Sequence, residues 1–282
     1  MLEQVAFKSF LENYQLTWGE PKRVGIIAAG NLPLVCFHDI LMTLLAGHIC
    51  ICKCSHQDKV LISYLRERWI EILPGIAELF VISDRLERLD FLISTGSNNT
   101  ARYIEALYPN IPKLVRKNRF SVGILKAGLS ENQMKGLAED ILLYNGLGCR
   151  NVSNLLIHPE ADLILFSKIL ENYPQKQINP LYLERVLYER IRLEQLGGTF
   201  TAFPKINLKF SSQFSYASMG LIFGINIQQE GEKELLERHR DQIQVVVGRD
   251  IEYGLAQSPR LKDFADNVDT LKLLSTLSDH SA

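Results

Sequence analysis

Short apolar runs alternate with amphipathic segments along the first half of the chain. The apolar runs are typical of buried strands, whereas the amphipathic segments repeat their apolar residues every three or four positions, as helices do. The pattern predicts strands at residues 23–29, 48–53, 79–83, 90–95, 113–116 and 121–125, and helices at 34–47, 59–73, 99–108 and 131–146. Because strands that alternate with helices usually form a parallel sheet covered on both faces, we predict a Rossmann-type α/β domain.

The pattern changes after Cys149. Strands are predicted at residues 154–159, 206–210, 220–228 and 243–248, and helices at 161–173 and 180–198. We therefore expect one domain over residues 1–148 and a second α/β domain over residues 149–247. The tail, residues 248–282, is expected to pack back across the first domain.

Composition and charge exclude several classes of protein. The chain is 46% hydrophobic and 22% charged, with a net charge of -1, and no long run of Lys and Arg suggests a nucleic-acid partner. The longest apolar segment is interrupted by His38 and Asp39 and is too short to span a bilayer. The amino terminus does not resemble a signal peptide, so we expect a cytoplasmic protein with reduced cysteines.

Four of the five cysteines are expected to pack in the core. Cys50, Cys52 and Cys54 alternate along a predicted strand and therefore share one face, and Cys36 lies on an apolar helical face. Structural zinc sites usually use a CxxC turn that wraps the ion, whereas alternating cysteines on a strand do not converge well. We favour buried thiols over a metal site, and predict no bound metal.

Cys149 differs from the other four. It follows Gly146 and Gly148 and precedes Arg150, near the predicted domain junction. Glycines let a ligand approach closely, and a neighbouring cation lowers the pKa of a thiol. A single loop cysteine is nevertheless more often structural than catalytic, so the local chemistry leaves both interpretations open.

Two turns could bind a nucleotide. In the segment STGSNNTARY, a strand ends near Ser94, Gly96 permits close approach of the backbone, and a helix begins after Ser97. The amino terminus of that helix could bind a phosphate, although Ser and Asn are also ordinary helix caps. Lys53 and Ser55 follow another strand, at an edge where ligands of such sheets collect, although a solvated turn is the better explanation of these residues taken alone.

Taken together, four segments in order resemble the aldehyde dehydrogenase superfamily, and in particular its acyl-CoA reductase (LuxC-like) branch. The segments are GIIAAGNLPLV, ICKCSHQDK, STGSNNTARY and YNGLGCRN, and the resemblance covers roughly the first 155 residues. It implies an aldehyde dehydrogenase-like fold, with a cofactor-binding domain over residues 1–148 and a catalytic domain over residues 149–247. It also implies roles for single residues: Cys149 as nucleophile, Asn31 in the oxyanion hole, and Lys53, Ser55, His56, Gly96 and Ser97 as cofactor contacts.

Two departures from the family pattern change the expected reaction. Hydrolytic aldehyde dehydrogenases carry a Glu-Leu-Gly-Gly segment whose Glu activates water, whereas residues 114–122 here read LVRKNRFSV. The Glu-x-Phe-Gly-Pro segment that holds the nicotinamide ribose is not evident either, and fuller members begin with a longer amino-terminal region. The first departure favours a reductase over a hydrolytic enzyme, and the second keeps a non-catalytic relative as an alternative.

The resemblance therefore implies an acyl-CoA reductase. Cys149 would form an acyl-enzyme from an acyl-CoA or acyl-carrier thioester, and NAD(P)H would reduce it to an aldehyde. The alternatives are an NAD(P)-dependent aldehyde dehydrogenase and an inactive binding or scaffold relative. His56 stands where NAD-preferring relatives often place a Glu, so NADP(H) is favoured over NAD(H). Dimers are common for this fold, and a homodimer is therefore one expected state.

Overall fold

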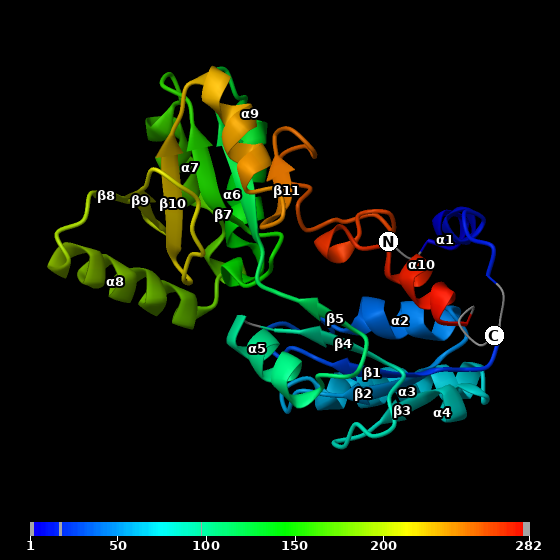
Figure 1. The fold of residues 1–282 in the computed structure, drawn as a ribbon. Helices are drawn as coiled ribbons and strands as arrows, with labels where there is room; N and C mark the ends of the chain where they lie inside the picture. The colour runs from blue at the N-terminus through cyan, green and yellow to red at the C-terminus, as the bar shows by residue number, and fades with distance from the viewer. Residues whose placement is uncertain (1–2, 17–18, 97, 279–282) are drawn as a thin grey trace. The chain divides into compact units, whose positions relative to one another are not determined.

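The computed structural model describes residues 3–16, 19–96 and 98–278, which form two compact units (Figure 1). Unit 1 runs up to Asn118 and resumes at Arg260, whereas unit 2 is continuous from Arg119 to Pro259. Both units are α/β, as predicted. Within the described ranges, no helix is long and apolar enough to cross a membrane.

Unit 1 contains one parallel sheet with helices on both faces. Its strands are β1 (Arg23–Ile27), β2 (Ile49–Lys53), β3 (Phe80–Ile82), β4 (Phe91–Thr95) and β5 (Lys113–Arg116). Its helices are α1 (Gln4–Leu11), α2 (Phe37–Leu45), α3 (Lys59–Ile72), α4 (Ile76–Leu79), α5 (Asn98–Leu107) and α10 (Thr270–Ser275), with 3₁₀ turns at Ala265–Asn267 and Thr276–Ser278. The strand order is β3-β2-β1-β4-β5, as in the first five strands of a doubly wound fold.

The local sequence explains these elements. The central strands carry the apolar runs RVGII, ICICK and FLIST, which are buried because helices cover both faces of the sheet. Helix α2 ends just before Gly47, whose φ of 79° favours glycine and turns the chain into β2. Figure 1 shows α2 and α10 on one face of this sheet and α3 and α4 on the other.

The last part of the chain belongs to the core of unit 1. Leu261, Leu271 and Leu274 are buried in the same cluster as residues of β1, β2 and α2. Arg116, at the end of β5, is also buried there and donates hydrogen bonds from Nη2 to Asp39 Oδ1 at 2.8 Å and to Thr270 Oγ1 at 2.8 Å. A buried ion pair and an apolar cluster thus fix α10 to α2.

Unit 2 is built on a mixed sheet of order β11-β6-β7-β10-β9-β8, in which only the β8–β9 pair is antiparallel. Its strands are β6 (Phe120–Leu125), β7 (Val152–Ile157), β8 (Phe200–Ala202), β9 (Asn207–Phe210), β10 (Leu221–Asn226) and β11 (Ile243–Val247). Its helices are α6 (Glu131–Leu142), α7 (Leu163–Asn172), α8 (Pro180–Gln195) and α9 (Gln229–Arg238), with 3₁₀ turns at Leu143–Gly146 and Gln175–Gln177.

Two apolar clusters cover the two faces of this sheet. Residues of α6, α7 and α8 pack on one face around Leu155 and Phe166, and Leu236 of α9 packs on the other with Phe120 and Val246. Helix α6 begins with a capping box in which Ser130 and Gln133 satisfy each other's backbone amides. Both faces are therefore buried, which explains why most residues of β6 and β7 are apolar.

The two boundaries lie elsewhere than predicted. The sequence places one boundary after residue 148 and the other after residue 247, whereas the structure places them after Asn118 and Pro259. The reason is strand pairing: β6 forms its hydrogen bonds with β7 and β11, so β6 and α6 belong to unit 2. Of the predicted tail, residues 260–278 pack in unit 1, and residues 248–259 stay with unit 2.

Candidate functional site

The predicted cofactor contacts lie at one edge of the unit 1 sheet. Ile27 of β1 pairs with Lys53 of β2 on one side and with Ser94 of β4 on the other, so the three strands end at the same level. We call the edge of the sheet formed by the ends of these three strands the carboxyl edge. Lys53 and His56 are exposed there, and Ser55 is half-buried. Ligands of open parallel sheets bind at such an edge, outside the ends of the strands.

The turns after β1 and β2 are in direct contact. A Cβ added to Gly30 would lie 2.7 Å from Ser55 Cβ, so any larger residue would push the two turns apart. The backbone amide of Leu34 donates to Asp58 Oδ2 at 2.8 Å, which ties the turns together a second time. The structure therefore brings the turn that holds Asn31, whose side chain is exposed, against Ser55.

The turn after β4 is equally tight. A Cβ added to Gly96 would lie 2.8 Å from Thr100 Cγ2, one turn into α5, so only glycine fits without movement. Ser97, the second predicted phosphate contact, lies outside the described residues. Ser94 Oγ is buried beside this turn and has no hydrogen-bond partner within the described ranges. Together with the exposed cation of Lys53 and the start of α5, these groups fit a dinucleotide.

Cys149 lies in unit 2, on the loop of residues 143–151 between α6 and β7, which we call the Cys149 loop. Its side chain is exposed. Asn151, which is buried, organises the loop: its Nδ2 donates to the carbonyl oxygens of Leu143 at 2.7 Å and Asp140 at 3.1 Å, and its Oδ1 accepts from the amide of Gly148 at 2.9 Å. These bonds satisfy carbonyl groups that the end of α6 would otherwise leave without partners.

Two further side chains hold the loop next to Cys149. The hydroxyl of Ser121, on β6, donates to the carbonyl oxygen of Cys149 at 2.8 Å. The guanidinium of Arg150 donates to the carbonyl oxygen of Ala256. Arg150, for which the sequence predicted no role beyond a nearby positive charge, thus anchors the loop to the segment that follows β11. The backbone of Cys149 is held on both sides while its side chain faces solvent.

The segment after β11 is fixed to α6 by a buried carboxylate. Asp140 accepts hydrogen bonds from the amides of Gly254 at 2.7 Å and Ala256 at 2.9 Å. Burial raises the pKa of Asp140 to about 6, although these two amides and the charge of Arg150 act in the opposite direction. Gly136 lets the segment come close, because a Cβ there would lie 2.7 Å from the carbonyl carbon of Tyr253.

Asn145, the first residue of the predicted nucleophile motif, holds the start of the Cys149 loop. It adopts a left-handed backbone conformation with φ of 57°, which Asn tolerates better than most residues. Its Oδ1 accepts a hydrogen bond from the amide of Asn179, at the start of α8, at 2.9 Å. Gly146, with φ of 67°, continues the left-handed turn.

The structure thus groups the predicted residues within each unit. Asn31, Lys53, Ser55, His56 and Gly96 lie on turns at the carboxyl edge of unit 1, and Cys149 lies in unit 2. Sequence reasoning missed the residues that hold the loop in place. The sequence did contain a signal for Asn151. This residue immediately precedes an apolar strand, a position where an Asn side chain commonly bonds to nearby backbone groups.

The packing interpretation of the other cysteines is confirmed for Cys36, Cys50 and Cys52, which are buried. Cys54 packs against the same cluster but is only half-buried. Across the described part of the chain, no group of three or more His, Cys, Asp or Glu residues could hold a metal ion.

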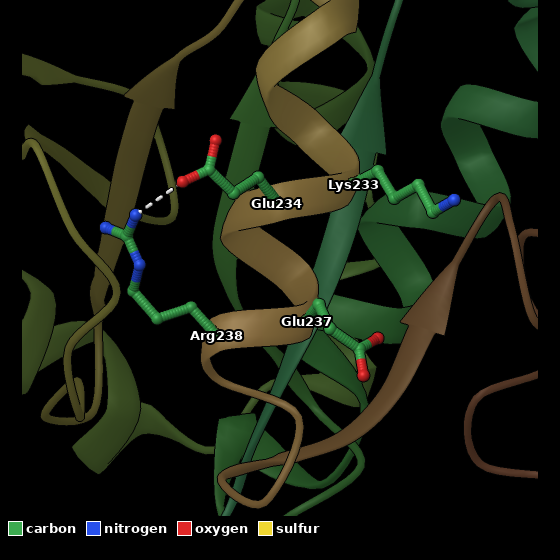
Figure 2. A pocket seen from close by; sticks show the side chains of 4 residues that line it. All are labelled: Lys233, Glu234, Glu237 and Arg238. Atoms are coloured by element: carbon green, nitrogen blue, oxygen red, sulfur yellow. Dashed lines mark hydrogen bonds and ion pairs between the residues drawn. The ribbon is translucent and has the colours of Figure 1, made fainter.

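A shallow hollow on α9 is lined by two acids and two bases (Figure 2). The residues are Lys233, Glu234, Glu237 and Arg238. Arg238 Nη2 lies 2.8 Å from Glu234 Oε1, an exposed ion pair between residues one helical turn apart. Such pairs are typical of a solvated helix face, and the hollow has no feature of a catalytic site.

Comparison with solved structures identifies the fold. The aldehyde dehydrogenase of Mycobacterium tuberculosis complexed with NAD+ is 17% identical with a TM-score of 0.61, over 82% of this chain and 60% of that one. The NAD+ complex of aldehyde dehydrogenase from Bacillus cereus is 17% identical with a TM-score of 0.63, over 82% and 56% of the two chains. A bifunctional proline utilization A (PutA) protein is 12% identical with a TM-score of 0.61, over 81% and 28%.

This chain therefore spans less than two thirds of the length of each of these three proteins. At such identities the likeness shows the fold alone, and the predicted aldehyde dehydrogenase-like α/β fold is confirmed. A search of curated proteins found no match.

A family model gives the more specific result. The model described as acyl-CoA reductase (LuxC) matches residues 8–172, which include the carboxyl edge of unit 1 and the Cys149 loop. The match covers more than half of the 282 residues and confirms the resemblance inferred from the four motifs. The chain belongs to the acyl-CoA reductase (LuxC) family.

Proposed function

We propose that this protein reduces an acyl thioester to an aldehyde through an acyl-enzyme on Cys149, with NAD(P)H as the reductant. The observation that carries the proposal is the LuxC family match, which extends through an exposed cysteine on a loop with a fixed backbone. Unit 1 would then bind the nucleotide, and unit 2 would supply the nucleophile. A cytoplasmic location stays a prediction.

The first half-reaction uses the Cys149 loop. The Cys149 thiolate attacks the thioester carbonyl carbon, so that a new carbon–sulfur bond forms while the bond to the thiol of coenzyme A or of an acyl carrier breaks. The departing thiolate takes up a proton from solvent. The amide of Cys149 and the carboxamide of Asn31 are the proposed donors to the oxyanion. Loss of one such donor typically slows the step about 100- to 1,000-fold.

The second half-reaction depends on the carboxyl edge of unit 1. A bound reduced nicotinamide nucleotide would supply the hydride for the acyl carbon. Collapse of the resulting tetrahedral species breaks the bond to Cys149, releases the aldehyde and restores the thiolate. Lys53 and Ser55 are proposed to contact the adenosine ribose, and Gly96 to admit the phosphates next to the start of α5.

We further propose that NADPH is preferred to NADH. Lys53 and His56 are both exposed beside Ser55, so either side chain can approach a 2'-phosphate. A carboxylate in the place of His56 would instead repel that phosphate. Comparing turnover with the two nucleotides tests this, and a preference for NADH would refute it.

One contact favours reduction over hydrolysis. Hydrolytic relatives place a water-activating Glu in the segment that corresponds to residues 114–122. In this chain, Arg116 of that segment is buried and paired with Asp39. An arginine in an ion pair cannot serve as a general base, because it remains protonated. Arg116 therefore supplies no base in this segment, which supports a mechanism in which hydride rather than water attacks the acyl-enzyme.

A homodimer is also proposed, with α8 as its contact. Leu181, Tyr188 and Ile191 of this helix are large apolar side chains that are between 47% and 64% exposed. An apolar helix face of this kind would be covered by a second copy. Sedimentation of the protein and of Ile191→Glu tests the proposal, which predicts a dimer that the charge dissociates. A monomeric parent protein would refute it.

Mass spectrometry after mixing the protein with an acyl-CoA tests the main proposal. We expect an acyl adduct on the Cys149 peptide, discharged to an aldehyde by NADPH, and none in Cys149→Ser. Asn31→Ala should form the same adduct about 100- to 1,000-fold more slowly. Discharge to a carboxylic acid, without a reduced nucleotide, would favour an aldehyde dehydrogenase. Absence of an adduct with every chain length tried would favour a non-catalytic relative.

A further inference from the structure

Two thiols at the carboxyl edge have no role in the proposed reaction. Cys52 is the penultimate residue of β2, and Cys54 immediately follows the strand. Their sulfur atoms lie 3.8 Å apart, because residues two apart on an extended strand point to the same side. Between them stands Lys53, and after them Ser55, which are the two proposed ribose contacts.

The two thiols differ in exposure and acidity. Cys52 is fully buried, whereas Cys54 is half-buried. A hydrogen bond with Cys52 lowers the pKa of Cys54 and outweighs burial and the charge of Asp58, which act in the opposite direction. Hydrogen bonds with Cys36 and Cys54, together with burial, raise the pKa of Cys52. Cys54 is therefore the more accessible and the more acidic of the two thiols.

We propose that Cys52 and Cys54 form a redox-active pair, which hydrogen peroxide converts to an intrachain disulfide that weakens nucleotide binding at the carboxyl edge. The disulfide is argued from the distance between the two sulfur atoms and does not depend on the proposed function. Its effect on the nucleotide rests on the proposed function, because it requires that Lys53 and Ser55 bind the ribose.

The oxidation proceeds in two steps. The Cys54 thiolate attacks one peroxide oxygen, so a sulfur–oxygen bond forms, the oxygen–oxygen bond breaks, and the departing hydroxide is protonated to water. The Cys52 sulfur then attacks the Cys54 sulfur of the sulfenic acid. The sulfur–sulfur bond forms, the sulfur–oxygen bond breaks, and the hydroxide leaves with the proton of Cys52 as a second water. The two thiols lose two electrons, and the peroxide gains them.

The position of Cys54 beyond the strand allows the bond to form. The sulfurs must approach from 3.8 Å to about 2.05 Å, the length of a disulfide bond. Cys52 is held in the sheet, where it pairs with Ile26 and Ile82, so Cys54 is the residue that moves. Movement of Cys54 displaces Ser55, which packs against Gly30 in the neighbouring turn. Formation of the disulfide therefore moves both Lys53, which lies between the two cysteines, and Ser55, which follows them.

Peptide mapping tests the disulfide. The full-length Cys149→Ser protein, which lacks the exposed nucleophile, is treated with graded hydrogen peroxide, quenched in acid, alkylated under denaturing conditions and digested. We expect the peptide with Cys52 and Cys54 to lose two hydrogens and to recover them with dithiothreitol. Cys50→Ser is the matched control: Cys50 lies on the same strand face and is buried, and its removal should leave the disulfide unchanged.

Three results would overturn this part of the proposal. Cys52 and Cys54 could both remain open to alkylation after oxidation. Cys54 could proceed to an irreversible acid without pairing. Cys52 could instead pair with Cys36, its other hydrogen-bond partner.

Nucleotide titration tests the consequence. In the Cys149→Ser protein, we expect the dissociation constant of NADPH to rise at least about tenfold on oxidation, a coupling within the usual range, and to return after dithiothreitol. Addition of Cys54→Ser should abolish the response to peroxide. Equal affinity of the reduced and oxidised proteins would refute the coupling. If the reduced protein binds neither NADPH nor NADH, the proposed function is refuted, whereas the disulfide found by peptide mapping is not affected by that result.

Discussion

Replacement of Asn151 by alanine should destabilise unit 2 through the Cys149 loop. The buried Asn151 side chain caps the end of α6 and also accepts from the amide of Gly148. Alanine cannot donate or accept, so the change removes both amide donors and the acceptor in one step. The loop would lose the bonds that fix its backbone before Cys149.

The magnitude follows from the number of bonds. The two Nδ2 hydrogens and the Oδ1 acceptor account for about three hydrogen bonds, each worth about 1 kcal/mol net in proteins. We therefore expect the free energy of unfolding to fall by about 3 kcal/mol, which corresponds to about 10 °C in the melting temperature of a domain of this size. A smaller decrease in the free energy of unfolding would mean that water enters the loop and bonds to the carbonyl oxygens that Asn151 leaves.

Thermal unfolding followed by circular dichroism measures the effect. The matched control is Asn172→Ala, because Asn172 is exposed at the end of α7 and donates one hydrogen bond, to the carbonyl oxygen of Lys168. An exposed substitution of this kind is expected to change stability by about 0.5 kcal/mol or less. If Asn151→Ala is no more destabilising than the control, the proposed role of Asn151 in holding the loop is refuted.

Three further changes test the contacts within each unit. Gly136→Ala should lower the free energy of unfolding by at least about 1 kcal/mol in denaturant titration, because its Cβ would meet the backbone of Tyr253; an unchanged midpoint would contradict the close packing. Arg116→Met should cost about 3–5 kcal/mol in the same assay, because it leaves the Asp39 carboxylate buried without its partner, and a loss below 1 kcal/mol would contradict this. Burial raises the pKa of Asp140 to about 6, so the native state binds this proton more tightly than the unfolded state does. The stability that the bound proton confers is therefore lost as pH rises through 4 to 6. In Asp140→Asn this part of the pH dependence of unfolding should be absent, and a pH profile identical to that of the parent protein would contradict the assignment.

Local periodicity was enough to predict most elements but not their partners. Strand β6 was predicted as a strand, yet its place in the second sheet depends on pairing with β11, more than a hundred residues later. No window of sequence contains that information. Helix α9 was missed because its segment, QEGEKELLER, offers few apolar residues to define a face. Strand β8 was missed because it has only three residues.

The candidate site divides in the same way. The residues that carry chemistry were found from motifs, because their type and spacing are constrained by substrate and cofactor. Ser121 and Asp140 were missed because each acts on backbone groups, and a backbone partner leaves no mark in the sequence. Cys54 was predicted to be buried because alternation describes a strand, whereas the strand ends one residue before it.

The split of unit 1 has a consequence for synthesis of the protein on the ribosome. Unit 2 is continuous and can fold as soon as Pro259 has left the exit tunnel. Unit 1 cannot complete its core at that time, because Leu271 and Leu274 are still inside the tunnel, and Arg116 waits for Thr270. The nucleotide-binding edge proposed for β1, β2 and β4 therefore rests on a sheet whose core is closed by residues that follow unit 2, so loss of residues 260–278 would damage unit 1 and spare unit 2.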